Sequence, residues 1–117
     1  MELKRIAAGE HEIVQVISDD ILIRNEQDAL DLMANAGAQY IVLSDSNFER
    51  DFFDLSTRKL GSILQKFTTY FVKLAVIGDF EAYPSKILKE FIYESNKRGE
   101  YLFVKSLEDA VKRWCES

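Results

Sequence analysis

Hydroxyl and carboxylate side chains follow the apolar runs of this chain at the points where those runs end. Their oxygen atoms are the ligands that Mg²⁺ prefers, but Asp and Ser after a strand also form turns and cap helices. A site for a small polar ligand or for Mg²⁺ is therefore one interpretation, and a structural role is the other. The residues in question are Asp19 and Asp20 after Ile17, Ser44 and Asp45 after Leu43, Asp54 at the second predicted helix, and Asp79 after Gly78.

The sequence signatures of common catalytic sites are missing. The chain contains no Walker loop, no Gly-x-Gly-x-x-Gly, no Gly-x-Ser-x-Gly and no cysteine-rich metal motif. Its one histidine, His11, lies beside a predicted hairpin turn, where we expect a solvated turn residue and not a general base. We therefore expect a binding domain more than an enzyme, and we assign no catalytic residue and no cofactor.

Apolar runs predict the strands that must position these polar residues. Two short runs on either side of Gly9 predict a β-hairpin, because glycine readily adopts the positive φ of a tight turn. Two later runs are apolar without interruption, which is typical of strands that are covered on both faces. The predicted strands are Leu3 to Ala7, Ile13 to Ile17, Tyr40 to Leu43, Val72 to Ile77 and Tyr101 to Val104, with a brief further run from Ile21 to Ile23.

Capping residues and apolar stripes predict four helices between and after the strands. Asp, Asn and Ser at helix starts accept hydrogen bonds from free backbone N–H groups, proline suits the first helical position, and glycine ends helices in the left-handed conformation. The first helix is capped by Asn25 with Asp28 and ends at Gly37; the second begins at about Phe52 or Ser56 and ends at Thr69; the third has Pro84 at its first position and ends at Gly99; the last begins at the capping box of Ser106 and Asp109.

The predicted order is β-β-α-β-α-β-α-β-α over a single domain, residues 1–117. Strands that are joined through helices run parallel, so the fold class is α/β with a mixed, mostly parallel sheet of about four or five strands and about four helices. Ligands of such sheets bind outside the carboxyl ends of the strands. The polar residues listed above are predicted to lie at this edge and to line a pocket there.

Composition limits the classes of partner. The net charge of −5 argues against binding of a nucleic-acid backbone, which requires a basic face. A lone cysteine, Cys115, cannot form an intrachain disulfide, which favours a reducing compartment. No run approaches the roughly 18 apolar residues of a membrane span. We therefore expect a cytoplasmic protein that binds neither nucleic acid nor membrane, with a protein partner or a second copy of the chain as the alternatives.

Aromatic residues near the predicted edge allow two interpretations. Core packing is the commoner fate of such side chains, but loop aromatics also line pockets and partner surfaces. The residues are Phe48, Phe52, Phe53, Tyr70, Phe71, Phe80 and Tyr83.

The segment from Phe53 to Thr57, followed by Leu60-Gly61, resembles the helix entry of STAS domains, the sulfate-transporter and anti-anti-sigma modules. The run Leu74 to Gly78 is similar to their following strand. The resemblance implies a STAS-like fold in which Ser56 is the serine that a partner kinase phosphorylates, beside Asp54 and Thr57. The chain departs from the family pattern at Leu55 and Thr57, which replace a serine and the glycine, and in its longer preceding loop.

Over nearly its whole length the chain resembles an uncharacterised bacterial family, the domain of unknown function numbered 4180. The runs 16–20, 27–33, 51–55 and 91–97 carry this likeness, which implies no activity. The leading hypothesis is a regulatory or protein-interaction module with Ser56 as an anion contact or phosphorylation site. The rival hypothesis is a domain that binds a small ligand or Mg²⁺ through Asp45, Asp54 and Asp79, and a homodimer is compatible with either.

Overall fold

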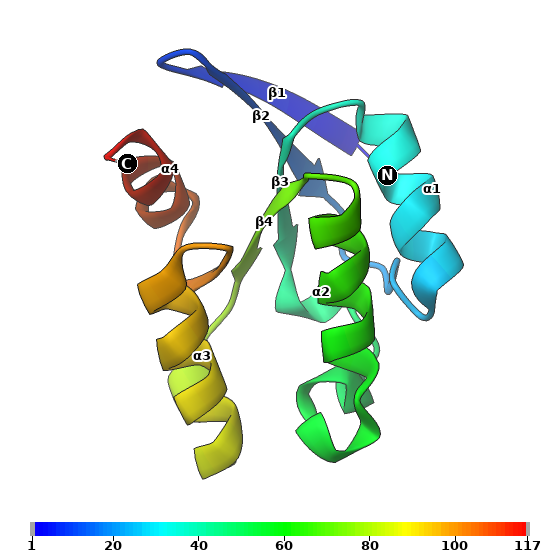
Figure 1. Cartoon of the computed structure of the whole chain (residues 1–117). Helices are drawn as coiled ribbons and strands as arrows, with labels where there is room; N and C mark the ends of the chain where they lie inside the picture. Colours follow the sequence, from blue (N-terminus) through cyan, green and yellow to red (C-terminus); the bar gives the residue numbers. More distant parts are fainter. Residues whose placement is uncertain (1, 117) are drawn as a thin grey trace.

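The computed structural model describes residues 2–116, which form one mixed sheet with helices on both faces (Figure 1). Within these residues the sheet has five strands in the order β1-β2-β3-β4-β5; the β1–β2 pair is antiparallel and the later pairs are parallel. This arrangement confirms the predicted element order. The strands are β1 (Glu2–Ala8), β2 (His11–Ile17), β3 (Tyr40–Ser44), β4 (Lys73–Ile77) and β5 (Tyr101–Val104), and the helices are α1 (Glu26–Ala36), α2 (Lys59–Thr69), α3 (Lys86–Arg98) and α4 (Leu107–Cys115).

Several predicted capping residues define the helix ends. Asn25 accepts a hydrogen bond from the backbone N–H of Asp28, and Ser106 accepts one from that of Asp109. Gly37 and Gly99 end α1 and α3 in the left-handed conformation, with φ of 57° and 79°. The local sequence therefore sets these boundaries, as expected for caps and glycine stops.

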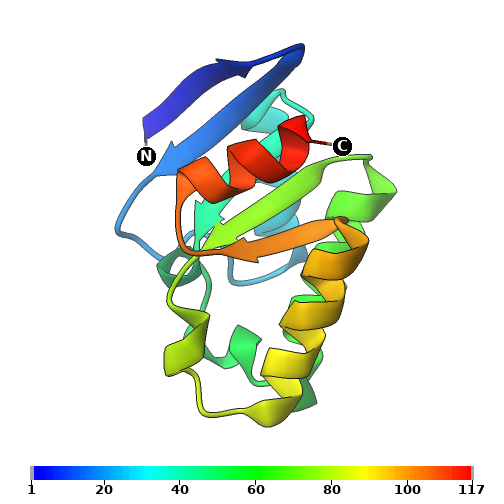
Figure 2. The same ribbon diagram turned by 90° about the vertical axis from the view of Figure 1, so that its left-hand side faces the viewer.

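The helices divide unequally between the two faces of the sheet. Consecutive right-handed crossovers in one direction place α1, α2 and α3 on the same face, where they pack over the larger core. α4 alone covers the other face, through Ala110 and Trp114, as Figure 2 shows with α4 in front of the strands. The central strands are thus covered on both sides, which explains their uninterrupted apolar runs.

Two predicted helix starts are wrong. α2 begins at Lys59 and not at Phe52 or Ser56, because Phe52 is buried in the core and Arg58 adopts a left-handed conformation (φ 62°) that separates the preceding turns from the helix. α3 begins after Pro84: Ser85 is its N-cap and its Oγ accepts from the N–H of Leu88 at 3.1 Å. The segment before α2 folds into short 3₁₀ turns at Asp45–Asn47, Arg50–Phe53 and Leu55–Thr57.

The structure also tests the predictions for the residues in and after the β1–β2 hairpin. Gly9 has the expected positive φ of 64°. His11 begins β2 beside the turn, as expected, and is half-buried because its ring packs 4.5 Å from that of Tyr40. The run from Ile21 to Ile23 is a loop, and it is joined to the next loop by an isolated β-bridge between Ile23 and Phe48 and by the N–H groups of Leu22 and Ile23, which donate to the carbonyl of Asn47.

The strand order determines where a binding site can form. Because the order never reverses, the sheet has no topological switch point, the usual location of a crevice in open α/β sheets. Any hollow at the carboxyl edge must therefore be built by the loops themselves. Within residues 2–116 no helix is long and apolar enough to cross a membrane.

Candidate functional site

Asn47 joins the loops that follow β2 and β3. Its side chain is fully buried, and the side-chain amide donates to the carbonyls of Ser18 and Asp20, each at 2.9 Å. Its Oδ1 accepts from the backbone N–H of Ser44 at 2.8 Å. Both N–H groups of this amide therefore hold the loop after β3 against the loop after β2, at the carboxyl ends of the strands.

Asp45 links the loop after β3 to the segment before α3. The hydroxyl of Tyr83 donates to its Oδ2 at 2.7 Å. The approach depends on Gly78, since a Cβ at that position would lie 2.7 Å from both Cγ and Oδ2 of Asp45. Burial, followed by the hydrogen bond to Asp45 and the charge of that carboxylate, raises the pKa of Tyr83 above its usual range.

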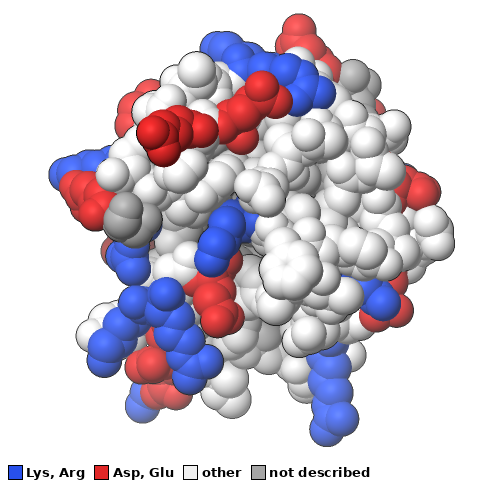
Figure 3. All heavy atoms as spheres, turned by 45° about the horizontal axis from the view of Figure 1, so that its top comes forward, with Lys and Arg blue, Asp and Glu red and all other residues white. Residues whose placement is uncertain are grey.

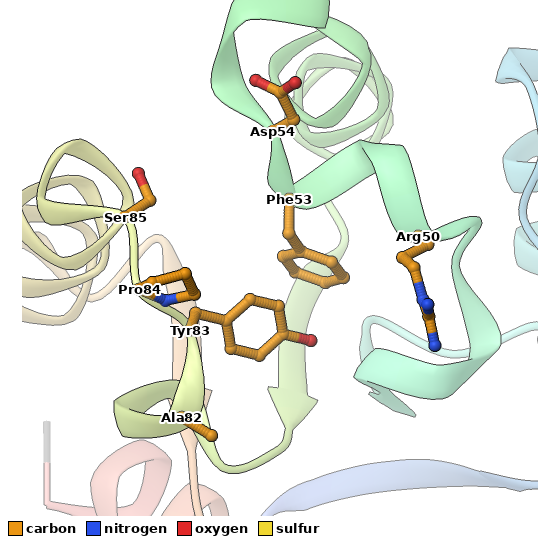
Figure 4. A pocket seen from close by; sticks show the side chains of 7 residues that line it. All are labelled: Arg50, Phe53, Asp54, Ala82, Tyr83, Pro84 and Ser85. Atoms are coloured by element: carbon orange, nitrogen blue, oxygen red, sulfur yellow. The ribbon is translucent and has the colours of Figure 1, made fainter.

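The loops enclose an open hollow of about 630 Å³ above this contact (Figure 4). Phe53 and Tyr83 form its apolar wall, with their ring centroids 5.3 Å apart. In Figure 4 the two rings lie between Arg50 on one side and Pro84 and Ser85 on the other. The lining residues are Arg50, Phe53, Asp54, Ala82, Tyr83, Pro84 and Ser85. We call this hollow the edge pocket.

A smaller hollow adjoins the edge pocket. It measures about 330 Å³ and shares Arg50, Phe53 and Tyr83 with the larger one. Asp45 and Ser46 contribute its polar wall. The aromatic pair and the arginine beside it thus border both hollows.

The structure brings together only part of the predicted edge site. Asp45 and Asp54 line the two hollows, and Ser44 binds Asn47 through its backbone. The other predicted residues, Asp19, Asp20 and Asp79, are exposed and line neither hollow. In the described part of the chain, no group of three or more His, Cys, Asp or Glu residues is placed to hold a metal ion, so Asp45, Asp54 and Asp79 do not form such a group.

Ser56 lies outside α2, and it contacts the edge pocket only through Asp54. It is exposed, and its Oγ and backbone N–H both donate to Oδ1 of Asp54, at 2.6 and 3.1 Å. Thr57 donates from Oγ1 to the carbonyl of Asp54 at 2.9 Å. Ser56 therefore does not cap α2; Arg58 occupies that position without a side-chain hydrogen bond.

These bonds yield a prediction for Asp54. The Ser56 hydroxyl first, and its backbone N–H second, hold the pKa of Asp54 below its usual range. We expect Ser56→Ala to raise this pKa toward the ordinary value of 3.8, because the larger of the two stabilising bonds to the carboxylate is removed. A carboxyl-carbon NMR titration measures the change.

Thr57→Val serves as the matched control, since Thr57 contacts the carbonyl of Asp54 and not the carboxylate. A depressed pKa adds stability above the unfolded-state pKa, and this contribution is lost as the pH falls through the folded-state pKa. The acid limb of the Ser56→Ala stability profile should accordingly be flatter. An Asp54 pKa that stays low in this variant would contradict the assignment.

The aromatic residues divide between the two predicted fates. Phe48, Phe52, Phe53 and Phe80 are buried in the larger core, while Tyr70 and Phe71 are exposed by 56% and 83%. The sequence interpretation did not identify Arg50, Pro84 or Ser85 as pocket residues. No sequence pattern identifies Arg50, because it is one charged residue in a polar loop. Ser85 follows the only proline, and a preference for Ser at N-caps could have identified it.

Comparison with protein families identifies a family for the chain. Residues 8–114 match the family model described as "Domain of unknown function (DUF4180)". Comparison with curated proteins and with solved structures gives no match, so the resemblance to STAS domains stays an expectation. The family match covers nearly all of the fold described above, including both hollows and their loops. The chain therefore belongs to this uncharacterised domain family.

Proposed function

We propose that this domain binds a small organic anion with a flat apolar body in the edge pocket. The observation that carries the proposal is the aromatic wall of Phe53 and Tyr83 beside the guanidinium of Arg50. Pockets for small molecules are mostly apolar with a few polar groups that fix orientation. A ring would pack against the wall, and a carboxylate would pair with the guanidinium.

Among the residues that line the edge pocket, Arg50 is the one cation and Asp54 is the one carboxylate. Arg50 is exposed and forms no ion pair with any described residue. The two nearby carboxylates accept hydrogen bonds from hydroxyl groups of the chain and do not pair with Arg50: Asp45 accepts from Tyr83, and Asp54 accepts from Ser56. In Figure 4 the Asp54 carboxylate points away from the two rings. Arg50 is thus the charged group of the pocket that remains available to a ligand.

Benzoate and benzyl alcohol provide a direct test, because they share a ring and differ in charge. We expect benzoate to shift the amide NMR signals of the loops at 45–54 and 80–85, and benzyl alcohol to bind more weakly. Arg50→Ala should weaken benzoate binding about tenfold, as expected for loss of one charge-assisted contact. Arg98→Ala removes a cation at the far end of α3 and serves as the control.

Two results would contradict the proposal. One is that benzoate shifts none of these signals at millimolar concentration. The other is that Arg50→Ala and Arg98→Ala bind benzoate equally well, which would mean that the pocket does not use its arginine.

A second candidate function uses Ser56, which is hydrogen-bonded to Asp54 of the edge pocket. Ser56 is exposed and contacts Asp54. We therefore propose that a phosphate on Ser56, with its charge of about −1.5 to −2, would change the surface to which a protein partner binds. Ser56→Asp and Ser56→Ala forms of the chain should then capture different proteins from the native cytosol. Identical partner lists would remove this candidate and leave the ligand proposal intact.

A further inference from the structure

The chain leaves α2 through a turn that normally contains glycine. The N–H of Val72 donates to the carbonyl of Phe67 at 2.9 Å, and that of Phe71 donates to the carbonyl of Thr68 at 3.1 Å. These two bonds define a Schellman motif, in which the residue at the position of Phe71 is left-handed and usually glycine. Phe71 adopts φ of 59° there. A bulky side chain with this backbone conformation is strained.

The side chain of Phe71 gains nothing within its own chain to offset that strain. It is 83% exposed, the highest value among the large hydrophobic residues that lie on the surface. The preceding Tyr70 is 56% exposed. Neither local conformation nor core packing therefore accounts for an aromatic residue at this position, and a contact outside the chain would account for it.

A hollow lies directly beside Phe71. It measures about 480 Å³ and lies between the carboxyl-terminal ends of α1 and α2. The edge pocket lies at the opposite end of the strands. Its lining is uncharged: Leu30, Met33, Ala34, Gly37, Ala38, Gln39, Tyr70 and Val72. We call Phe71 and these residues the Phe71 surface. Figure 3 shows the broad uncharged area on this side of the molecule.

We infer that the Phe71 surface binds a second copy of this chain, with the Phe71 ring of each copy in the hollow of the other. A protruding ring and an apolar hollow on one surface are self-complementary about a two-fold axis, as an isologous dimer requires. The absence of charged residues in this hollow removes one obstacle to such a dimer. Each chain carries a net charge of −5, and two copies repel each other least where they meet through a surface without charged residues.

Phe71→Gly tests the inference through two readouts that move in opposite directions. Sedimentation velocity over a concentration series should show a monomer–dimer equilibrium for the unchanged chain and a monomer for the variant. At concentrations where both are monomeric, the melting temperature of the variant should be higher by roughly 3–6 °C, because glycine relieves the backbone strain. Tyr93→Ala removes an aromatic residue that is 66% exposed on α3 and should leave dimerisation unchanged.

Ala34→Lys blocks the hollow while Phe71 is retained. Ala34 is exposed near the end of α1, where a lysine favours the helix dipole, so folding is preserved. This variant should also be monomeric. A mixture of Ala34→Lys and Phe71→Gly chains should form a weak heterodimer, since one ring and one open hollow are restored. A monomeric unchanged chain at millimolar concentration, or a Phe71→Gly variant that still forms a dimer, would overturn the inference.

Discussion

Asn47→Asp should destabilise this domain by about 3–5 kcal/mol, the range for breaking a buried polar network at one partner. The substitution is isosteric, and its Oδ1 can still accept from Ser44. The amide nitrogen, however, becomes an oxygen that faces the carbonyls of Ser18 and Asp20 at the present distance of 2.9 Å. Two acceptors lose their donor, and a fully buried site gains a charge. Urea unfolding at pH 7 measures the loss.

The pH dependence distinguishes this mechanism from a general loss of packing. Burial and the two facing carbonyls should raise the pKa of the introduced carboxyl in the folded state. A raised pKa means that the folded form is favoured below the unfolded-state value of about 3.9 and loses this advantage as the pH rises through the folded-state value. The difference in stability between Asn47→Asp and the unchanged chain should therefore shrink toward pH 4.

Ser46→Asp is the matched control, because it introduces the same charge at an exposed neighbour. We expect this variant to change stability by less than about 0.5 kcal/mol. Equal losses for the two variants, or an Asn47→Asp deficit that does not depend on pH, would show that Asn47 is not the element that ties the two loops together.

The sequence predicted the sheet and its element order because those features depend on short-range patterns. An uninterrupted run such as Tyr40 to Leu43 indicates a strand covered on both faces wherever it occurs. Asn25 and Gly37 delimit α1 by hydrogen bonds and backbone conformation that lie within a few residues. Such features need no knowledge of the tertiary structure.

The segment between β3 and α2 could not be predicted in this way. Its conformation depends on contacts with distant residues: Asn47 is fixed by carbonyls of the β2 exit loop, and Phe53 packs against Tyr83. A helix through Phe52 satisfies the local pattern, but Phe52 is buried in the core by 3₁₀ turns. The edge pocket is formed by this segment and by residues 82–85, so sequence patterns could not predict which residues line it.

Gly78→Ala should uncouple Asp45 from Tyr83 and lower stability by about 1–3 kcal/mol, the usual cost of overpacking. Gly78 does not have a positive φ, so alanine is compatible with its backbone. The cost arises from the new Cβ, which would lie 2.7 Å from the Asp45 carboxylate and 3.1 Å from its Cβ. Asp45 must turn away, and the hydrogen bond from Tyr83 is then lost.

The Tyr83 phenol reports this loss directly. Burial raises its pKa most, and the bond and charge of Asp45 raise it further. Turning Asp45 away should therefore lower the pKa of Tyr83 but leave it above the ordinary value of 10. Absorbance titration at alkaline pH, with Tyr83→Phe to identify the signal, measures the change. The raised pKa stabilises the fold below pH 10, and this contribution is lost as the pH rises, so the stability difference between Gly78→Ala and the unchanged chain should shrink at alkaline pH.

A double-mutant cycle separates the contact with Asp45 from any other effect of the added methyl group. Asp45→Ala removes the carboxylate that the new Cβ would meet, so Gly78→Ala should cost little in that background. We expect a coupling of about 1–2 kcal/mol, within the range for residues in contact. Additive losses would mean that Gly78 is required for a reason other than the approach of Asp45. A coupled loss would identify the small residue after β4 as the feature that lets the two loops close over the aromatic wall of the pocket.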